Sequence, residues 1–255
     1  MGLLEERLRA VRDGGAKAFV PYVTGGAPGV DAALLRALAE AGADAIEVGI
    51  PHSDPIMDGG VIQDASRLAL EAGTRTDDVL ATVAAAGLEV PVAAMTYANP
   101  VLRRGVDRFV ADLAAAGVAG LIVPDLPPEE SEELRGAAAE RGIDVVLLAA
   151  PGAAPERYRA IAREARGFVY CVATYGVTGA RDRLAETARA VVEGLRGLTD
   201  LPLLVGVGIS TPEQAASACA FADGVIVGSA LVAPLVGGDR AGALALAEAF
   251  RAAIA

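Results

Sequence analysis

Two carboxylates stand out as residues that could do chemistry, and both lie in the stretch Asp44–Gln63, which reads DAIEVGIPHSDPIMDGGVIQ. The stretch opens with large aliphatic and small residues in alternation, which predicts a strand with Glu47 on the face opposite the aliphatic side chains. Pro51 ends this strand, and the loop that follows carries Asp58 before a helix begins near Val61. A carboxylate on a rigid strand beside another on a loop could form an acid–base pair.

A structural role is equally compatible with this stretch. Glu47 could be a buried acid that pairs with an arginine, and the loop aspartates Asp54 and Asp58 could close Asx turns. The choice between an ion pair and acid–base chemistry therefore depends on the elements that position these side chains.

The composition argues against several classes of protein. The net charge of −11 disfavours a nucleic-acid-binding surface. No apolar run is long enough to span a bilayer, and the charged N-terminal segment has no secretory signal. Cys171 and Cys219 are too few for a disulfide framework. We therefore expect a cytoplasmic protein that binds neither nucleic acid nor membrane, with residues 1–255 forming one domain.

The scarcity of histidine and lysine limits the available chemistry. His52 is the only histidine, so a zinc hydrolase is disfavoured, and we expect this side chain to be exposed or at an interface. Lys17 is the only lysine and precedes the first strand, which disfavours a Schiff-base enzyme. We expect no metal and no cofactor, so catalysis would rest on carboxylates, hydroxyls and backbone amides.

Strand-like and helix-like segments alternate along the whole chain. Eight such units in about 250 residues predict an α/β fold, a single (β/α)8 TIM barrel, with an extra N-terminal amphipathic helix that carries Leu3, Leu4, Leu8 and Val11 on one side. A doubly wound open sheet is the alternative, and it is disfavoured because the first turn is not glycine-rich. The expected strands are Ala18–Val23, Asp44–Ile50, Val92–Thr96, Gly120–Val123, Asp144–Leu148, Gly167–Cys171, Pro202–Gly206 and Gly224–Val227. The expected helices are Ala32–Ala41, Thr76–Ala86, Val106–Ala115, Glu129–Arg141, Pro155–Ala165, Leu184–Leu198, Pro212–Cys219 and Arg240–Ile254.

A barrel places its active site at the C-terminal ends of the strands, where Glu47 lies. Glycine-containing loops follow the sixth, seventh and eighth strands at this same end, and backbone N–H groups there can bind an anion. The predicted phosphate site is lined by Gly179, Gly208, Gly228 and Ser229. The long loop after the sixth strand is a candidate lid that contacts the Asp58 loop through Thr178, the alternative being an idle surface loop.

Aromatic and aliphatic residues near the strand ends could form a flat apolar pocket beside Glu47. The predicted lining is Tyr22, Tyr97, Ile122, Leu148 and Tyr170. The alternative is that these residues fill the layers of the barrel, which is the role we expect for Phe168.

Taken together, these residues resemble the family of tryptophan synthase α subunits, which are indole-3-glycerol-phosphate lyases. The matching stretches run in family order from about Phe19 to Val232: PYVTGGAPG, AGADAIEVGIPHSDPIMDGGVIQ, MTYANPVLRRGVDRF, GLIVPDLPPEES, GFVYCVATYGVTGAR, GVGISTPEQ and ADGVIVGSALV. The resemblance implies that Glu47 and Asp58 are the catalytic acids and that the products are indole and glyceraldehyde 3-phosphate. The indole ring, once protonated at C3 by Glu47, would serve as its own electron sink, while Asp58 would bind the indole N–H.

Three positions depart from the family pattern. Ala27 replaces a usual acid, Gly60 replaces a usual proline, and His52 replaces a more common aromatic residue. None of these departures touches the two carboxylates. They bear on the stiffness of the loop and on the fit to a partner.

The resemblance also implies a partner, the tryptophan synthase β subunit, in an α2β2 complex. The rim that would face it carries Pro51, Asp54, Asn99 and Asp125 in proline-rich segments, although such prolines could merely cap the strands. Three other functions stay open at this point: a free-standing lyase that feeds indole to another pathway, a weakly active subunit that mainly activates its partner, and a sugar-phosphate isomerase. The single histidine and the Glu47/Asp58 pair argue against the isomerase.

Overall fold

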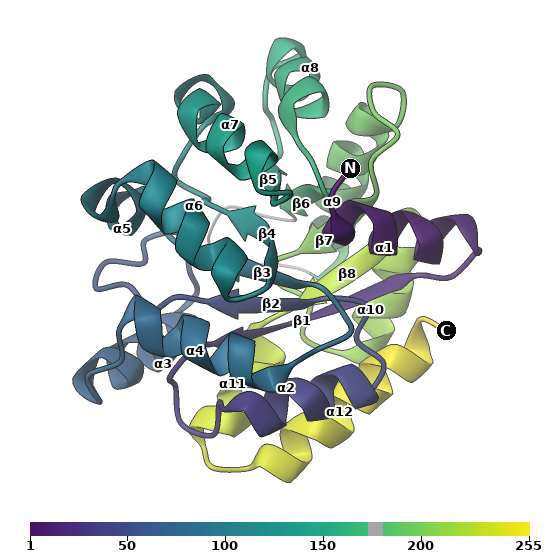
Figure 1. Ribbon diagram of the computed structural model, residues 1–255. Helices are drawn as coiled ribbons and strands as arrows, with labels where there is room; N and C mark the ends of the chain where they lie inside the picture. Colours follow the sequence, from purple (N-terminus) through teal and green to yellow (C-terminus); the bar gives the residue numbers. More distant parts are fainter. Residues whose placement is uncertain (173–180) are drawn as a thin grey trace.

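Eight parallel strands close into a barrel in the order of the sequence, β1 to β8, as a computed structural model of the chain shows (Figure 1). The structure describes residues 1–172 and 181–255. Each strand pairs with the next, and β8 pairs with β1, so the expected barrel is confirmed and the open sheet is excluded. The strands are β1 Ala18–Thr24, β2 Ile46–Gly49, β3 Val92–Met95, β4 Val118–Ile122, β5 Asp144–Ala149, β6 Val169–Val172, β7 Leu203–Gly206 and β8 Gly224–Val227.

Helices form the outer layer around the barrel (Figure 1). They are α1 Leu3–Asp13, α2 Ala32–Glu40, α3 Gly60–Glu71, α4 Thr76–Ala86, α5 Ala98–Arg104, α6 Val106–Ala115, the 3-10 helix η1 Pro128–Glu130, α7 Glu132–Glu140, α8 Pro155–Glu164, α9 Arg181–Arg196, α10 Pro212–Cys219, α11 Ser229–Val236 and α12 Arg240–Ala253. Two details differ from the expectations. The segment expected as one helix over Glu129–Arg141 is divided at Ser131 into η1 and α7, and α5 was not expected at all.

The extra N-terminal helix α1 packs against the barrel at the N-terminal ends of its strands. Leu4 and Leu8 are fully buried and belong to the cluster that fills the barrel interior. Asp144, the first residue of β5, accepts hydrogen bonds from the backbone N–H groups of Gly2 at 3.1 Å and Glu5 at 2.9 Å. This carboxylate satisfies N–H groups at the start of α1 that have no partner within the helix.

Residue alternation along β2 separates two environments. Ile46 and Val48 belong to the large cluster between the strands and the outer helices, whereas Ala45 belongs to the cluster inside the barrel. Glu47 shares the inner face with Ala45, as the alternation predicted. Phe168 is buried in the same inner cluster, which confirms its expected role as a barrel-filling residue.

The chain's lysine and its thiols lie away from Glu47. Lys17 immediately precedes β1 and donates a hydrogen bond to the backbone carbonyl of Ala222 at 2.8 Å, at the N-terminal end of the barrel. Cys171 and Cys219 are buried, free thiols. Within the part of the chain that the structure describes, no helix is long and apolar enough to cross a membrane.

Candidate active site

Glu47 occupies an interior position on β2 near the C-terminal end of the strand. Its register partners are Tyr22 on β1 and Ala93 on β3, so the backbone is held by hydrogen bonding on both sides. Only 1% of the residue is exposed. The small neighbours Ala45 and Gly49 leave the carboxylate as the one polar group that β2 sends into the barrel. The strand therefore fixes its position with little freedom.

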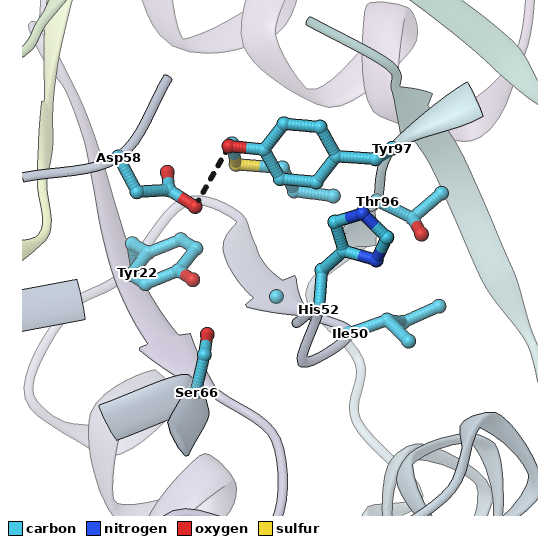
Figure 2. A pocket seen from close by; sticks show the side chains of 9 residues that line it. Tyr22, Ile50, His52, Asp58, Ser66, Thr96 and Tyr97 are labelled. Carbon is cyan, nitrogen blue, oxygen red and sulfur yellow. Dashed lines mark hydrogen bonds between the residues drawn. The ribbon is translucent and has the colours of Figure 1, made fainter. Parts of the chain in front are cut away.

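Asp58 lies on the loop between β2 and α3, and the hydroxyl of Tyr97 holds it (Figure 2). This hydroxyl donates a hydrogen bond to Asp58 Oδ2 at 3.1 Å and accepts one from the backbone N–H of Met57 at 3.1 Å. The side-chain amide of Gln63 donates to the backbone carbonyl of Asp58 at 2.9 Å. One phenol thus ties down two successive residues of the loop between β2 and α3.

The environment raises the pKa values of both carboxyl groups, and it raises that of Glu47 further. Burial, followed by the nearby charge of Asp58, raises the pKa of Glu47 to about 8. Burial raises the pKa of Asp58 to about 6, opposed by the hydrogen bond from Tyr97. At neutral pH, Glu47 is therefore mainly a neutral acid and Asp58 mainly a carboxylate. Two carboxyl groups whose pKa values differ in this way can take separate acid and base roles.

The structural alternative for Glu47, an ion pair with an arginine, is not seen among the side chains that the structure describes. In the described residues, no arginine or lysine lies within ion-pair distance of it, and its Oε2 atom is buried without a hydrogen-bond partner. Thr96 Oγ1 is also buried without a partner there. Buried polar atoms without partners are rare in folded proteins and call for an explanation, such as a ligand that completes them.

A cavity opens beside Asp58 at the C-terminal ends of β2 and β3, and Figure 2 shows the side chains around it. Its lining is Tyr22, Gly49, Ile50, His52, Asp58, Ser66, Met95, Thr96 and Tyr97. Tyr22 and Tyr97, both predicted for the pocket, therefore lie with Asp58. Burial, followed by the charge of Asp58, raises the pKa of Tyr22, so its phenol remains protonated.

His52 was expected to be exposed or at an interface, and exposure is wrong. It is half-buried, lines the cavity, and stacks on the ring of Tyr97 with centroids 4.9 Å apart and an interplanar angle of 20°. The sequence signal that could have placed it is its position directly after Pro51, close to the C-terminal end of β2. Ser66 and Thr96 were also not identified, because isolated hydroxyl residues carry no pattern.

The other three residues predicted for the apolar pocket lie inside the barrel. Ile122 and Tyr170 belong to the interior cluster, and Leu148 packs against it. The hydroxyl of Tyr170 lies so close to Gly206 that a Cβ atom there would collide with it. The cavity beside Asp58 is lined by none of these three residues. Their contact with a substrate ring stays a prediction.

The predicted phosphate residues that the structure describes lie at the ends of β7 and β8, which are neighbours in the barrel. Gly208 adopts a left-handed backbone with φ of +91° that favours glycine, and Ser229 is the first residue of α11. A Cβ atom at Gly228 would lie 3.4 Å from Tyr22 Cδ1, and one at Gly59 would lie 3.9 Å from Ser229 Oγ. The start of α11 therefore adjoins both Tyr22 and the end of the loop between β2 and α3. Gly179 and Thr178 lie outside the described residues.

The predicted partner rim lies after β2, β3 and β4. Pro51 is buried, whereas Asp54, Asn99 and Asp125 are exposed. The YANPVL segment forms the start of a helix, because Asn99 lies in the first turn of α5. Asp125 holds that turn by accepting a hydrogen bond from the backbone N–H of Ala98 at 2.9 Å.

Two of the positions that depart from the family pattern have simple environments. Ala27 is buried and packs with Tyr22 and Val232. Gly60 is the first residue of α3, and a Cβ atom there would meet nothing within 4 Å. Proline is well accepted at a first helical position, so the fold itself does not require glycine at residue 60.

The fold and the site together define a (β/α)8 barrel that carries two carboxyl groups with raised pKa values, Glu47 and Asp58, on β2 and the loop that follows it. The family model described as "Tryptophan synthase alpha chain" matches residues 8–249. The tryptophan synthase alpha chain of Synechocystis sp. is 47% identical over 246 residues, covering 94% of this chain and 93% of that protein. That of Carboxydothermus hydrogenoformans is 48% identical over 225 residues, covering 87% and 84%.

Solved structures agree with these relatives. Tryptophan synthase from M. tuberculosis in space group F222 is 43% identical with a TM-score of 0.91, covering 99% of this chain and 98% of that chain. Tryptophan synthase subunit alpha from Legionella pneumophila str. Paris is 34% identical with a TM-score of 0.90, covering 100% and 98%. The chain belongs to the tryptophan synthase alpha chain family.

Proposed function

We propose that Glu47 and Asp58 carry out the reaction of this family member, the cleavage of indole-3-glycerol phosphate into indole and glyceraldehyde 3-phosphate. The family assignment makes the chain a carbon–carbon lyase of tryptophan biosynthesis. The observation that carries the residue roles is the pair itself: a buried acid whose Oε2 atom has no hydrogen-bond partner among the described residues, and a carboxylate held by Tyr97. None of the comparisons favours a free-standing lyase of another pathway or a mainly activating subunit.

The chemistry begins with proton transfer from Glu47 to C3 of the indole ring. A pKa of about 8 keeps Glu47 protonated at neutral pH, as a general acid must be. The ring then carries positive charge at its nitrogen, and the Asp58 carboxylate stabilises this charge by accepting the N–H hydrogen bond. Glu47, now ionised, removes the proton from the glycerol hydroxyl next to the breaking bond. The electron pair of that carbon–carbon bond returns to the ring, which restores indole and leaves Glu47 protonated again.

The phosphate would bind at the ends of β7 and β8, which are neighbours in the barrel, with the loop after β6 completing the site. The proposed residues are Gly179, Gly208, Gly228 and Ser229. Backbone N–H groups at the start of α11 have no partners within the helix and favour an anion. Because this helix start adjoins Tyr22, binding energy from the phosphate can orient the reacting carbon beside Glu47. The proposed ring pocket consists of Tyr22, Tyr97, Ile122, Leu148 and Tyr170, with Thr178 on the lid.

The proposed partner is a tryptophan synthase β subunit, bound in an α2β2 complex at the rim of Pro51, Asp54, Asn99 and Asp125. Two large apolar residues support this surface, because Ile56 on the loop that carries Asp58 (the catalytic loop, residues 50–59) is 78% exposed and Leu102 on α5 is 63% exposed. Docking on the catalytic loop would couple the partner to Asp58. A cytoplasmic location and a single domain over residues 1–255 complete the proposal.

The function is tested by mixing the purified chain with indole-3-glycerol phosphate and measuring indole, with and without a β subunit. We expect slow cleavage by the chain alone and acceleration by the partner. A fast chain that does not respond to the β subunit would refute the coupling, and a chain inactive in both conditions would refute the lyase assignment.

A further inference from the structure

His52 contacts the site by stacking on another ring. It follows Pro51 at the mouth of the cavity, and its imidazole lies against the phenol of Tyr97 (Figure 2). Over the residues that the structure describes, His52 takes part in no hydrogen bond or ion pair, and no group of three side chains there could hold a metal ion. The stack is therefore the contact that links His52 to Tyr97 and, through its hydroxyl, to Asp58.

Tyr97 is the residue that can transmit this effect. It precedes α5, is 4% exposed, and holds Met57 and Asp58 through the single oxygen at its tip. That oxygen lies at the far end of the side chain, so a swing about χ1 carries it away from Asp58. Hydrogen bonds weaken steeply as their angle departs from linearity. The bond to Asp58 thus depends on whatever restrains the phenol.

We infer that His52 is a positioning residue for Asp58, because its ring restrains Tyr97 in the orientation that holds the carboxylate. The inference rests on the proposed role of Asp58 and deepens it. A flat aromatic ring supplies the restraint by its face, so the imidazole itself is not required. Phenylalanine at residue 52 should therefore preserve the restraint on Tyr97, and alanine should not.

The direct test follows the carboxyl carbon of Asp58 by NMR through a pH titration, with the signal assigned from Asp58→Asn. The hydrogen bond from Tyr97 lowers the pKa of Asp58, so Tyr97→Phe should raise it. We expect His52→Ala to raise the pKa of Asp58 by most of the shift that Tyr97→Phe causes. His52→Phe should leave this pKa unchanged. This readout does not depend on catalysis, so it judges the inference even if the chain fails to cleave indole-3-glycerol phosphate.

A kinetic cycle gives the second test. His52→Ala should lower kcat for indole formation about ten-fold with little change in KM, because it misplaces a catalytic group without removing a substrate contact. In the Tyr97→Phe background, the same substitution should lower kcat less than about two-fold, because no hydroxyl remains to be positioned. His52→Phe should restore most of kcat.

Two results would overturn the inference. If His52→Ala left the pKa of Asp58 unchanged, the stack would not control the hydrogen bond. If it raised KM, or lowered kcat equally in both backgrounds, His52 would act independently of Tyr97, for example by contacting the substrate.

Discussion

Glu47→Gln should be increasingly more stable than the wild type as the pH rises, because the fold forces Glu47 to remain neutral and the wild type loses stability for this reason. The pKa of Glu47 lies at about 8 in the folded protein, against an ordinary value of 4.5. Between these values the folded state keeps a proton that the unfolded state has released. Stability therefore falls by about 1.4 kcal/mol for each pH unit in this range. From pH 5 to pH 7 the loss is about 3 kcal/mol, and it levels off above the folded pKa.

Glutamine has nearly the same shape and cannot ionise, so Glu47→Gln should escape this loss. The assay is urea unfolding of both proteins at pH 5, 6 and 7. The control is Glu133→Gln, which removes an exposed carboxyl group on α7 and so measures the effect of losing one surface charge. The stability advantage of Glu47→Gln over the wild type should grow by about 3 kcal/mol across this range. An advantage that does not grow beyond the control would refute the claim that the barrel holds Glu47 neutral.

Three further substitutions probe the rest of the account. Asp58→Asn should lower kcat for indole formation by about 10²–10⁴ with an unchanged circular dichroism spectrum, and near-normal turnover would remove Asp58 from the mechanism. Ser229→Asp should weaken calorimetric binding of indole-3-glycerol phosphate far more than that of indole, because a carboxylate at the start of α11 repels phosphate; equal losses would place the phosphate elsewhere. Asp144→Ala should destabilise the fold by about 1–2 kcal/mol in urea, because α1 loses the carboxylate that accepts from Gly2 and Glu5, whereas an unchanged midpoint would show that this cap is dispensable.

The sequence was sufficient to predict the barrel and the position of Glu47, because both follow from residue alternation. An inward side chain at the C-terminal end of a barrel strand is determined once the period and the strand order are known. The motif around Asp58 made the family recognisable. The lack of a basic partner for Glu47 among the described side chains needed the structure, since an arginine from any distant segment could have neutralised it.

The contacts around Asp58 could not be predicted in the same way. Tyr97 was expected only as an apolar wall, whereas its hydroxyl bridges Met57 and Asp58. This bridge joins the ends of two neighbouring strands, and no local pattern specifies it. The α5 helix was missed for a related reason, because Pro100 was read as a loop former although proline is tolerated in the first turn of a helix.

The central claim is that Glu47 delivers a proton to C3 of indole, and hydrogen exchange at this carbon tests it most directly. The chain is incubated with indole and glycerol 3-phosphate in deuterated buffer, and loss of the C3 proton signal is followed by NMR. We predict exchange well above the buffer rate with the wild type and exchange at the buffer rate with Glu47→Gln. Equal exchange by the two proteins would contradict the account.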